Sequence, residues 1–480
     1  MAWQPTAKLH ISGYRFELRR IECALLGRDV RGVNDPIRAP AHSLLAGLVL
    51  AIILLAGCAV LAVLRPQPAL ANTPILMGKR SGALYVRLGE TLHPALNLAS
   101  ARLIVKTPAD PLPVPESQLA HSSRGPLLGI PGAPQFLGPP LDQNEVQWTV
   151  CDSRDGARQS TTVVVGRAEG PLSDVLARER TLLVRPASGG STYLLYDGRR
   201  AVVNMGESAV VRALGIDGQV PFPVSSALLN LIPETAPITA PRIPGAGGHG
   251  PAALPGFPVG SVLRVSRTGG DEFYVVLRDG IQRVGRLAAD LVRFSDSQRT
   301  RTAISVAPDL IHATPTVRRL PVSAFPDQTR TSAVVDGAVL CARWTQAPSV
   351  GVSFLVGGAP IPVGQEPVTL TQADGKGPAV DKVFVPPGRT AYVRASGLSG
   401  ADARTGTRYL ISDTGVRFAV HDDDAAHDLG LPDTVIPAPW PVLARLPEGP
   451  ELSRANALVA QDAVVVVAVG KLAGTAVGSP

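Results

Sequence analysis

The chain has 480 residues, of which 45% are hydrophobic and 18% are charged, and it contains 48 Gly and 45 Pro. The hydrophobic content excludes wholesale disorder, and the many Gly and Pro residues favour short strands and turns over long helices. The formal net charge is +7, but beyond the N-terminal arm the basic residues are not gathered into a stripe, which argues against nucleic-acid binding.

Residues 1–42 form a basic arm with a helical pattern. Four apolar residues follow one another at steps of four, three and four: Tyr14, Leu18, Ile21 and Leu25. This spacing predicts one apolar face of a helix, which Ser12 is expected to cap and Gly27 to end. Two interpretations are open and compatible: the helix lies on the inner membrane leaflet, or it docks on a cytoplasmic or membrane partner.

Residues 43–64 contain neither a charged residue nor Pro. As a helix they would reach about 33 Å, enough to cross a hydrocarbon core of about 30 Å. The basic arm predicts a cytoplasmic N-terminus and an exported region after the span. A cleaved signal peptide fits poorly, because the arm is too long. Cys58 sits in a lipoprotein-like Leu-Ala-Gly-Cys sequence, but the apolar run continues past it, which favours an ordinary Cys on a membrane helix.

The four cysteines separate by compartment. Cys23 falls in the cytoplasmic arm and Cys58 in the membrane, which leaves Cys151 and Cys341 in an oxidising space. These two are therefore expected to form a disulfide, with two separate buried thiols as the alternative. A bridge that closes a loop of about 190 residues would contribute roughly 5 kcal/mol on the chain-entropy model.

A hairpin-plus-helix pattern recurs in the exported region. Residues 193–203 and 274–284 are apolar runs around Asp-Gly turns, residues 409–420 carry a similar turn, and a helical run follows each. Residues 84–89 begin a weaker copy, with a helix expected over 91–103. The pattern predicts about four small repeats.

Two stretches between the repeats, 141–165 and 332–344, each carry strand-like apolar runs, a Cys and a Trp. We expect them to form one central sheet, extended by residues 352–355, 368–370 and 383–385. The predicted fold is α+β and mainly β: one N-terminal transmembrane helix, then an elongated exported region with a central β-rich core and the repeats. The predicted boundaries are 1–42 (arm), 43–64 (span), 72–120, 186–238, 255–320 and 401–470 (repeats), 121–185 with 321–400 (core) and 471–480 (loose tail).

Motifs for catalysis are missing from the sequence. The glycine–lysine pairs at 78–79, 375–376 and 470–471 lack the following Ser or Thr of a phosphate-binding loop, and no nucleophile elbow is present. His421, His427 and the acidic residues 422–424 could bind a divalent metal, but Asp residues that cap a short helix are the preferred interpretation. His93 is expected to be a surface or packing residue. We predict no catalytic residue and no metal ligand.

The order of several motifs along the chain resembles that of a known family. They are Ser12-Gly13-Tyr14-Arg15-Phe16, Leu18-Arg19-Arg20-Ile21-Glu22, Asp35-Pro36, the single span, Gln67, Leu84-Tyr85-Val86, Leu92-His93-Pro94, the stretch from Asn97 to Leu103, Gly129-Ile130-Pro131-Gly132-Ala133-Pro134, Trp148-Thr149-Val150-Cys151-Asp152, Tyr274-Val275-Val276-Leu277 and Cys341. Together they resemble EccB, a membrane component of the mycobacterial ESX, or type VII, secretion system. The resemblance covers nearly the whole chain.

This resemblance implies a single-pass protein of the cell inner membrane with a periplasmic C-terminal region stapled by Cys151–Cys341. It implies assembly with EccC, EccD and EccE, contact with the mycosin protease, self-association in a larger complex and a role in the export of protein substrates. The predicted function is a structural subunit. Family members are often labelled ATP hydrolases, and this label is the only reason to consider ATP as a cofactor. The alternatives are an ATP hydrolase with an unconventional nucleotide site, or a cell-wall binding module.

Overall fold

The computed structural model describes residues 8–27, 38–64, 73–155, 158–167, 173–175, 180–295, 302–327, 329–332, 339–346, 351–374, 379–399 and 405–462. The chain divides into two compact units, residues 1–73 and 74–480. The predicted tail, 471–480, lies outside the described residues.

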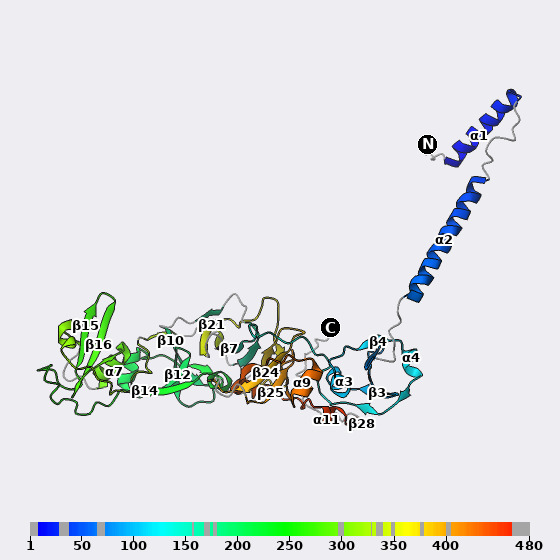
Figure 1. The fold of residues 1–480 in the computed structure, drawn as a ribbon. Coiled ribbons are helices and arrows are strands. Elements are labelled where there is room, and N and C mark those ends of the chain that lie inside the picture. The colour runs from blue at the N-terminus through cyan, green and yellow to red at the C-terminus, as the bar shows by residue number, and fades with distance from the viewer. Residues whose placement is uncertain are drawn as a thin grey trace, which may run out of the picture. The chain divides into compact units, whose positions relative to one another are not determined.

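The first unit holds two helices, α1 (Lys8–Leu25) and α2 (Arg38–Leu64) (Figure 1). The four residues of the predicted apolar face of α1 are all exposed. Ser12 lies inside α1, which begins at Lys8, so the predicted cap is wrong. The predicted end is confirmed, because α1 stops at Leu25 and Gly27 has a φ of 64°. Residues 43–64 are helical as expected, and α2 extends the helix back to Arg38.

The second unit is built around a seven-stranded central sheet in the order β22-β23-β8-β7-β20-β21-β9. Its strands are β7 (Trp148–Asp155), β8 (Arg158–Val165), β9 (Ser173–Val175), β20 (Val339–Thr345), β21 (Gly351–Gly357), β22 (Val368–Thr369) and β23 (Lys382–Phe384). β20 pairs antiparallel with β7, and Trp344 lies opposite Trp148. The central-sheet strands expected within 141–165, 339–344, 352–355, 368–370 and 383–385 are therefore confirmed, although the first begins only at Trp148. Ser332 instead pairs with Leu182 in another sheet, and residues 333–338 lie outside the described part.

Four further sheets accompany the central sheet. The first contains β1 (Ile75–Gly78), β2 (Leu84–Leu88), β3 (Thr91–Ala95), β4 (Leu112–Val114), β5 (Ser123–Arg124), β6 (Leu127–Leu128) and β28 (Ala460–Gln461), with α3 (Leu98–Val105), α4 (Glu116–Ala120) and α11 (Arg454–Ala457) beside it. The second contains β10 (Arg180–Pro186), β11 (Thr192–Tyr196), β12 (Arg199–Val203), β13 (Phe222–Val224), β14 (Glu234–Ile238) and β19 (Arg330–Ser332), with α5 (Ser208–Leu214) and α6 (Ser226–Asn230). The third contains β15 (Val262–Arg267), β16 (Gly270–Leu277), β17 (Gly280–Val284) and β18 (Ile304–Ser305), with α7 (Arg286–Ser295) and α8 (Pro308–His312). The fourth contains β24 (Ala391–Ser396), β25 (Arg408–Ile411), β26 (Arg417–Val420) and β27 (Ile436–Pro439), with α9 (Asp423–Leu429) and α10 (Trp440–Leu443).

These four sheets share one order of elements. Each has three consecutive antiparallel strands, a helix, a strand parallel to the first of the three, and a second short helix. The hairpins predicted around the Asp-Gly turns are confirmed as β11–β12 and β16–β17, and the third as β25–β26. In the first turn both Asp197 and Gly198 have positive φ, 43° and 70°, which a tight hairpin requires. The return strands, β4, β13, β18 and β27, have no comparable sequence signal.

The helix expected over 91–103 is partly wrong. Thr91–Ala95 is strand β3, paired with β2, and the helix α3 begins only at Leu98. Its cap is Asn97, whose side chain accepts a hydrogen bond from the Ser100 N–H. The Pro at position 94 suits an extended segment better than a helix interior, which explains why this segment forms a strand.

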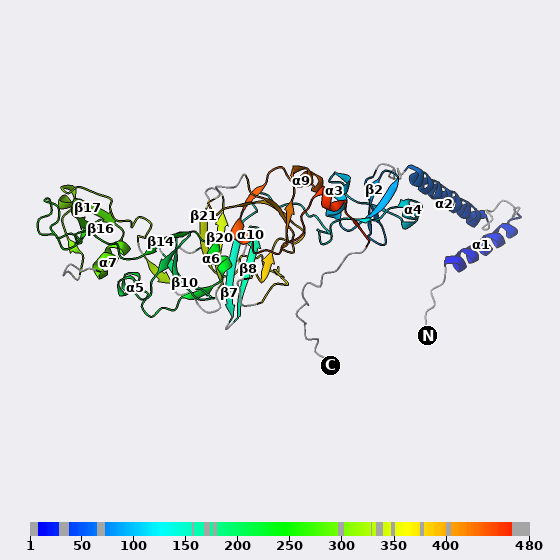
Figure 2. The ribbon, with the colours of Figure 1, turned by 90° about the horizontal axis from the view of Figure 1, so that it is seen from below.

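Two large apolar cores join elements that are distant in sequence. One contains residues of the central sheet together with residues of α6 and α10, such as Trp148, Leu228 and Leu443. α6 packs against both β7 and α10 (Figure 2). The other core joins the first and fourth sheets, through residues such as Leu103 of α3 and Leu429 of α9. By contrast, two clusters in the third sheet draw their members from residues 243–325 alone.

Candidate functional site

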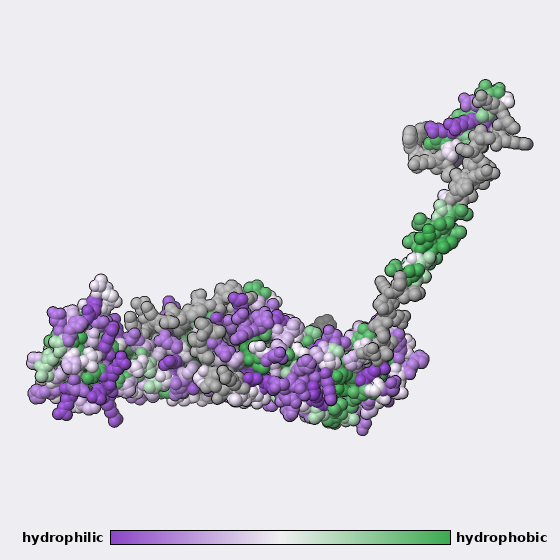
Figure 3. All heavy atoms as spheres, viewed as in Figure 1, coloured by the Kyte–Doolittle hydropathy of each residue, from purple (hydrophilic) through white to green (hydrophobic). Residues whose placement is uncertain are grey.

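The helix α2 is the candidate membrane-spanning segment of the first unit. Its stretch Ser43–Leu61 has 19 residues with a mean hydropathy of 2.9, and none of it is buried by the rest of the protein. Figure 3 shows the hydrophobic side chains that surround it. Its length and composition suit a membrane span. Cys58 is one of its exposed side chains.

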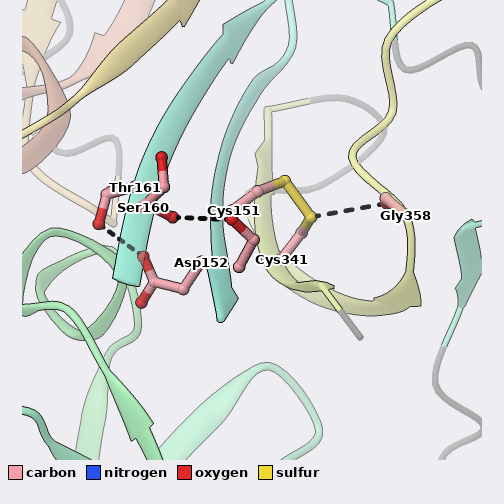
Figure 4. Close-up of a disulfide and its surroundings, with 7 residues drawn as sticks. Cys151, Asp152, Ser160, Thr161, Cys341 and Gly358 are labelled. Carbon is pink, nitrogen blue, oxygen red and sulfur yellow. Dashed lines mark hydrogen bonds between the residues drawn. A yellow bond between two sulfur atoms is a disulfide. The ribbon is translucent and has the colours of Figure 1, made fainter. Parts of the chain in front are cut away.

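A disulfide between Cys151 and Cys341 joins the central strands β7 and β20 (Figure 4). The two residues lie directly opposite each other in the antiparallel pair, and both are at most 1% exposed. The predicted pairing is confirmed, and the alternative of two separate thiols is wrong. The second and third sheets lie between residues 151 and 341 in sequence. The disulfide therefore links the strand from which this long segment leaves the central sheet to the strand at which it returns.

The next residue in β7, Asp152, points away from the disulfide toward Thr161 of β8 (Figure 4). Its side chain is 1% exposed. One carboxylate oxygen accepts a hydrogen bond from the Thr161 hydroxyl at 2.8 Å, and the other accepts one from the Ser225 N–H at 2.5 Å. Ser225 is the N-cap of α6 in the second sheet. A buried carboxylate therefore connects the central sheet to the start of that helix.

A second buried carboxylate lies beside the first. Asp381, 3% exposed, accepts hydrogen bonds from the Thr161 N–H at 2.8 Å and from the Asp374 N–H at 3.1 Å. Thr161 thus donates to both carboxylates, through its hydroxyl to Asp152 and through its backbone to Asp381. Burial, reinforced by the charge of Asp381, raises the pKa of Asp152 to about 6, although its hydrogen bonds act in the opposite direction.

Our sequence analysis missed these two carboxylates. The available signal was strand alternation, because Asp152 falls on the same face of β7 as Trp148 and Val150, both of which are fully buried. An Asp at such a position must be paired or protonated, since an isolated buried charge is costly. The partner residues could not be found from sequence, because Ser225 and Asp381 lie 73 and 229 residues away.

The acidic segment at the start of α9 behaves as the capping interpretation predicts. Asp422 is the N-cap and accepts a hydrogen bond from the Ala425 N–H at 2.7 Å. Asp423 pairs with Arg408, and Asp424 pairs with Arg454 at 2.7 Å.

The remaining members of the segment have separate partners. Arg454 also binds the buried Asp428 at 2.6 Å, and His421 contacts Glu451 at 3.0 Å, which raises the pKa of His421. In the described part of the chain, no group of three or more His, Cys, Asp or Glu side chains is arranged to hold a metal ion.

Two other candidates from the sequence have structural positions. The His93 ring lies against Gly125, and its Nδ1 is 3.2 Å from the Pro126 carbonyl oxygen, as expected for a packing residue. The Gly78–Lys79 pair lies at the end of β1, where the Lys79 N–H donates to the Val114 carbonyl at 2.9 Å. The other two glycine–lysine pairs lie outside the described residues.

Comparison with known proteins gives one family for almost the entire chain. The sequence profile of the EccB family, described as type VII secretion system ESX-1, transport TM domain B, matches residues 3–466. The chain belongs to the EccB family.

The similarity of this EccB-family chain to individual members is consistent along its length. It is 36% identical over 478 residues to a protein of Mycolicibacterium smegmatis named ESX-3 secretion system ATPase EccB3, covering 95% of this chain and 90% of the relative. It is 33% identical over 479 residues to the ESX-5 secretion system ATPase EccB5 of Mycobacterium tuberculosis, covering 95% and 94% of the two chains.

Two solved structures share its fold. A chain of an intact ESX-5 inner membrane complex matches with a TM-score of 0.71 at 31% identity, covering 97% of both chains. The EccB3 dimer from the ESX-3 core complex matches with a TM-score of 0.70 at 33% identity, covering 81% of this chain and 100% of that one.

Proposed function

We propose that this EccB-family chain is a structural subunit of an ESX, or type VII, inner-membrane secretion complex, anchored by α2 and needed for the export of protein substrates. The observation that carries the proposal is the match, over 97% of both chains, to a subunit of an intact ESX-5 inner membrane complex. The apolar helix α2 supplies the anchor that such a subunit needs.

The orientation follows from the basic arm that precedes α2. Basic residues near a span stay in the cytoplasm, so α1 lies inside the cell and the second unit lies in the periplasm. One relative is described as a dimer, which supports self-association of this chain within the complex. EccC, EccD, EccE and the mycosin protease are the further partners that we propose on the basis of family resemblance.

The four small sheets are, in this proposal, copies of one repeated unit that offers contact surfaces to other subunits. Their shared order of strands and helices supports this, because unrelated segments would rarely follow the same mixed parallel and antiparallel pairing four times. Three apolar cores draw residues from more than one sheet, so the copies pack against one another and against the central sheet. The third sheet also has two clusters of its own.

Removal of residues 1–64 tests the structural role. We expect the shortened protein to be exported and folded when given a cleavable signal sequence, but to be absent from the membrane complex on native gels, with substrate secretion lost. A control with the arm intact and α2 replaced by an unrelated apolar helix of the same length separates anchoring from specific contacts. Intact assembly and secretion after deletion would reject the proposal.

A second candidate function, ATP hydrolysis, is favoured only by the names of the relatives, which call those proteins ATPases. Calorimetric titration of residues 72–480 with magnesium and ATP distinguishes the two. Saturable binding would support a nucleotide site of unconventional form, and hydrolysis abolished by one substitution would establish the enzyme. The absence of heat at high ATP would leave the structural role.

A further inference from the structure

Two arginines lie on one face of the first sheet. Arg87 of β2 pairs with Leu92 of β3, and Leu92 pairs with Arg124 of β5, so the three residues share one row across the sheet. The guanidinium carbon of Arg124 lies 5.9 Å from the centre of the Tyr85 ring, which is on the same face because alternate residues of a strand share a face. Val86 points to the opposite face and is fully buried in the core that includes α3.

Neither guanidinium forms a hydrogen bond or an ion pair with a residue that the structure describes. The Nε of Arg87 is buried without an acceptor, whereas Arg102 of the same region binds Asp110 at 2.9 Å. Buried polar atoms in folded proteins normally have a partner. The acid nearest to Arg87 in sequence is Glu90, in the turn between β2 and β3, and it does not pair with either arginine. The row therefore offers two positive charges to an anion from outside the chain.

This row lies where the chain arrives from α2. The Arg87 N–H donates to the carbonyl of Pro74 at 2.9 Å, and Pro74 is the first residue of the second unit. Residues 65–73 connect it to Leu64, the last residue of α2, and they include Arg65 but no acid. Ten residue steps of extended chain reach at most about 35 Å. Chain length alone therefore keeps Pro74 within that distance of the end of α2.

The residue after Arg87 adds an apolar side chain to the same end of the sheet. Leu88 is 37% exposed, and Gly89, with a φ of 60°, begins the tight turn to β3. Arginine, tyrosine and an exposed leucine together suit the boundary between water and lipid. Tyr is enriched at that boundary, and Arg binds phosphate oxygens in pairs while its stem covers apolar surface.

We propose that Arg87 and Arg124 bind the phosphate groups of anionic phospholipids on the periplasmic surface of the membrane, with Leu88 in contact with the same surface. This contact would hold the first sheet against the membrane. The inference rests on the proposed function, because it requires α2 to span that membrane. A basic residue near an anionic surface strengthens contact about fivefold, so the two arginines together contribute roughly 25-fold. Glu90 opposes the contact, because its charge is repelled by the lipid phosphates.

A fluorescent label near the arginines tests the proposal in the full-length protein. Cys23 and Cys58 are replaced by Ala, and the label is attached at Ser123→Cys, an exposed position next to Arg124. A matched control carries the label at Gly269→Cys in the third sheet, where a Cβ meets open space. Both proteins are placed in nanodiscs that contain a lipid with a spin-labelled headgroup, which quenches a label in contact with the membrane. The discs hold phosphatidylglycerol mixed with phosphatidylcholine, or phosphatidylcholine alone.

We expect the label at position 123 to be quenched in the phosphatidylglycerol discs and not in phosphatidylcholine, and the control label to be quenched in neither. Arg124→Gln, at an exposed position, should weaken the contact about fivefold, and Arg87→Gln with Arg124→Gln roughly 25-fold. Glu90→Gln should strengthen it. Arg278→Gln changes an exposed arginine in the turn between β16 and β17 and should leave the contact unchanged.

Equal quenching at position 123 in both lipids, or full quenching in the double arginine variant, would overturn the proposal. Loss of quenching when inorganic phosphate is added at constant ionic strength would also overturn it, because the arginines would then prefer free phosphate to a lipid headgroup. Hydrogen exchange of α2 in the same discs tests the anchor separately. A protected α2 without quenching at position 123 rejects this inference alone, whereas an unprotected α2 rejects the anchor of the proposed function.

Discussion

The central sheet and the third small sheet are held together in different ways. The central sheet pairs β7 with β20, strands about 190 residues apart in the chain, and a disulfide joins the two. Two buried carboxylates, Asp152 and Asp381, are bound by Thr161 on the neighbouring strand β8. The third sheet pairs β15, β16 and β17, which follow one another, and two of its clusters are filled by residues 243–325. Its helix α7 reaches a neighbouring core, through Leu287 and Leu291 in the cluster of the second sheet. Long-range pairing carries a large loop-closure cost, so it needs specific and covalent ties that local pairing does not need.

Loss of the disulfide should give the largest difference between the two regions. In a double variant, Cys151→Ser with Cys341→Ser, we expect the central sheet to lose up to about 5 kcal/mol, because the closed loop is long. Trp148 and Trp344 lie in this sheet and report its unfolding by fluorescence in a urea titration. Hydrogen exchange in β15–β17 should remain at the wild-type level. An equal loss of protection in the third sheet would show that the regions are not separate.

The same difference decides what could be predicted from the sequence. The hairpins at Asp197-Gly198 and Asp279-Gly280 were predictable, because alternating apolar residues and turn chemistry lie within about a dozen residues. The disulfide was also predictable, because Cys151 and Cys341 were the two cysteines expected in an oxidising space.

The parts that depend on distant partners were not predictable. The return strand β18 is two residues long, and no local sequence pattern indicates its pairing with β15. The role of Ser225 in binding Asp152 likewise depends on two segments that meet only in the folded chain. Local sequence patterns therefore predict the repeated units. The polar contact between the second sheet and the central sheet can be found only in the structure.

Matched core truncations provide the next largest effect. Leu340 in β20 and Leu263 in β15 are both fully buried, so replacement of either by Ala should cost about 2–5 kcal/mol. Leu340→Ala should destabilise the central sheet and, with it, the packing of α6 and α10. Leu263→Ala should lower protection only in β15–β18 and α8. Regional hydrogen exchange measures both effects, whereas tryptophan fluorescence follows the central sheet but not the third sheet, because the third sheet contains no Trp. A global loss of protection in Leu263→Ala would contradict the independence of the third sheet.

The smallest expected effect concerns the N-caps of α6 and α8. The Ser225 hydroxyl accepts a hydrogen bond from the Leu228 N–H at 3.1 Å, while its backbone N–H donates to Asp152. Ser225→Ala removes this cap and should destabilise α6 by about 1 kcal/mol, measured as faster hydrogen exchange of its amides. The matched change Ala307→Ser should protect α8 by up to about 1 kcal/mol, because that N-cap lacks a side-chain acceptor. Unchanged hydrogen exchange of α6 in Ser225→Ala would show that the Ser225 hydroxyl does not stabilise this helix, and that its packing against β7 and α10 holds it in place without the cap.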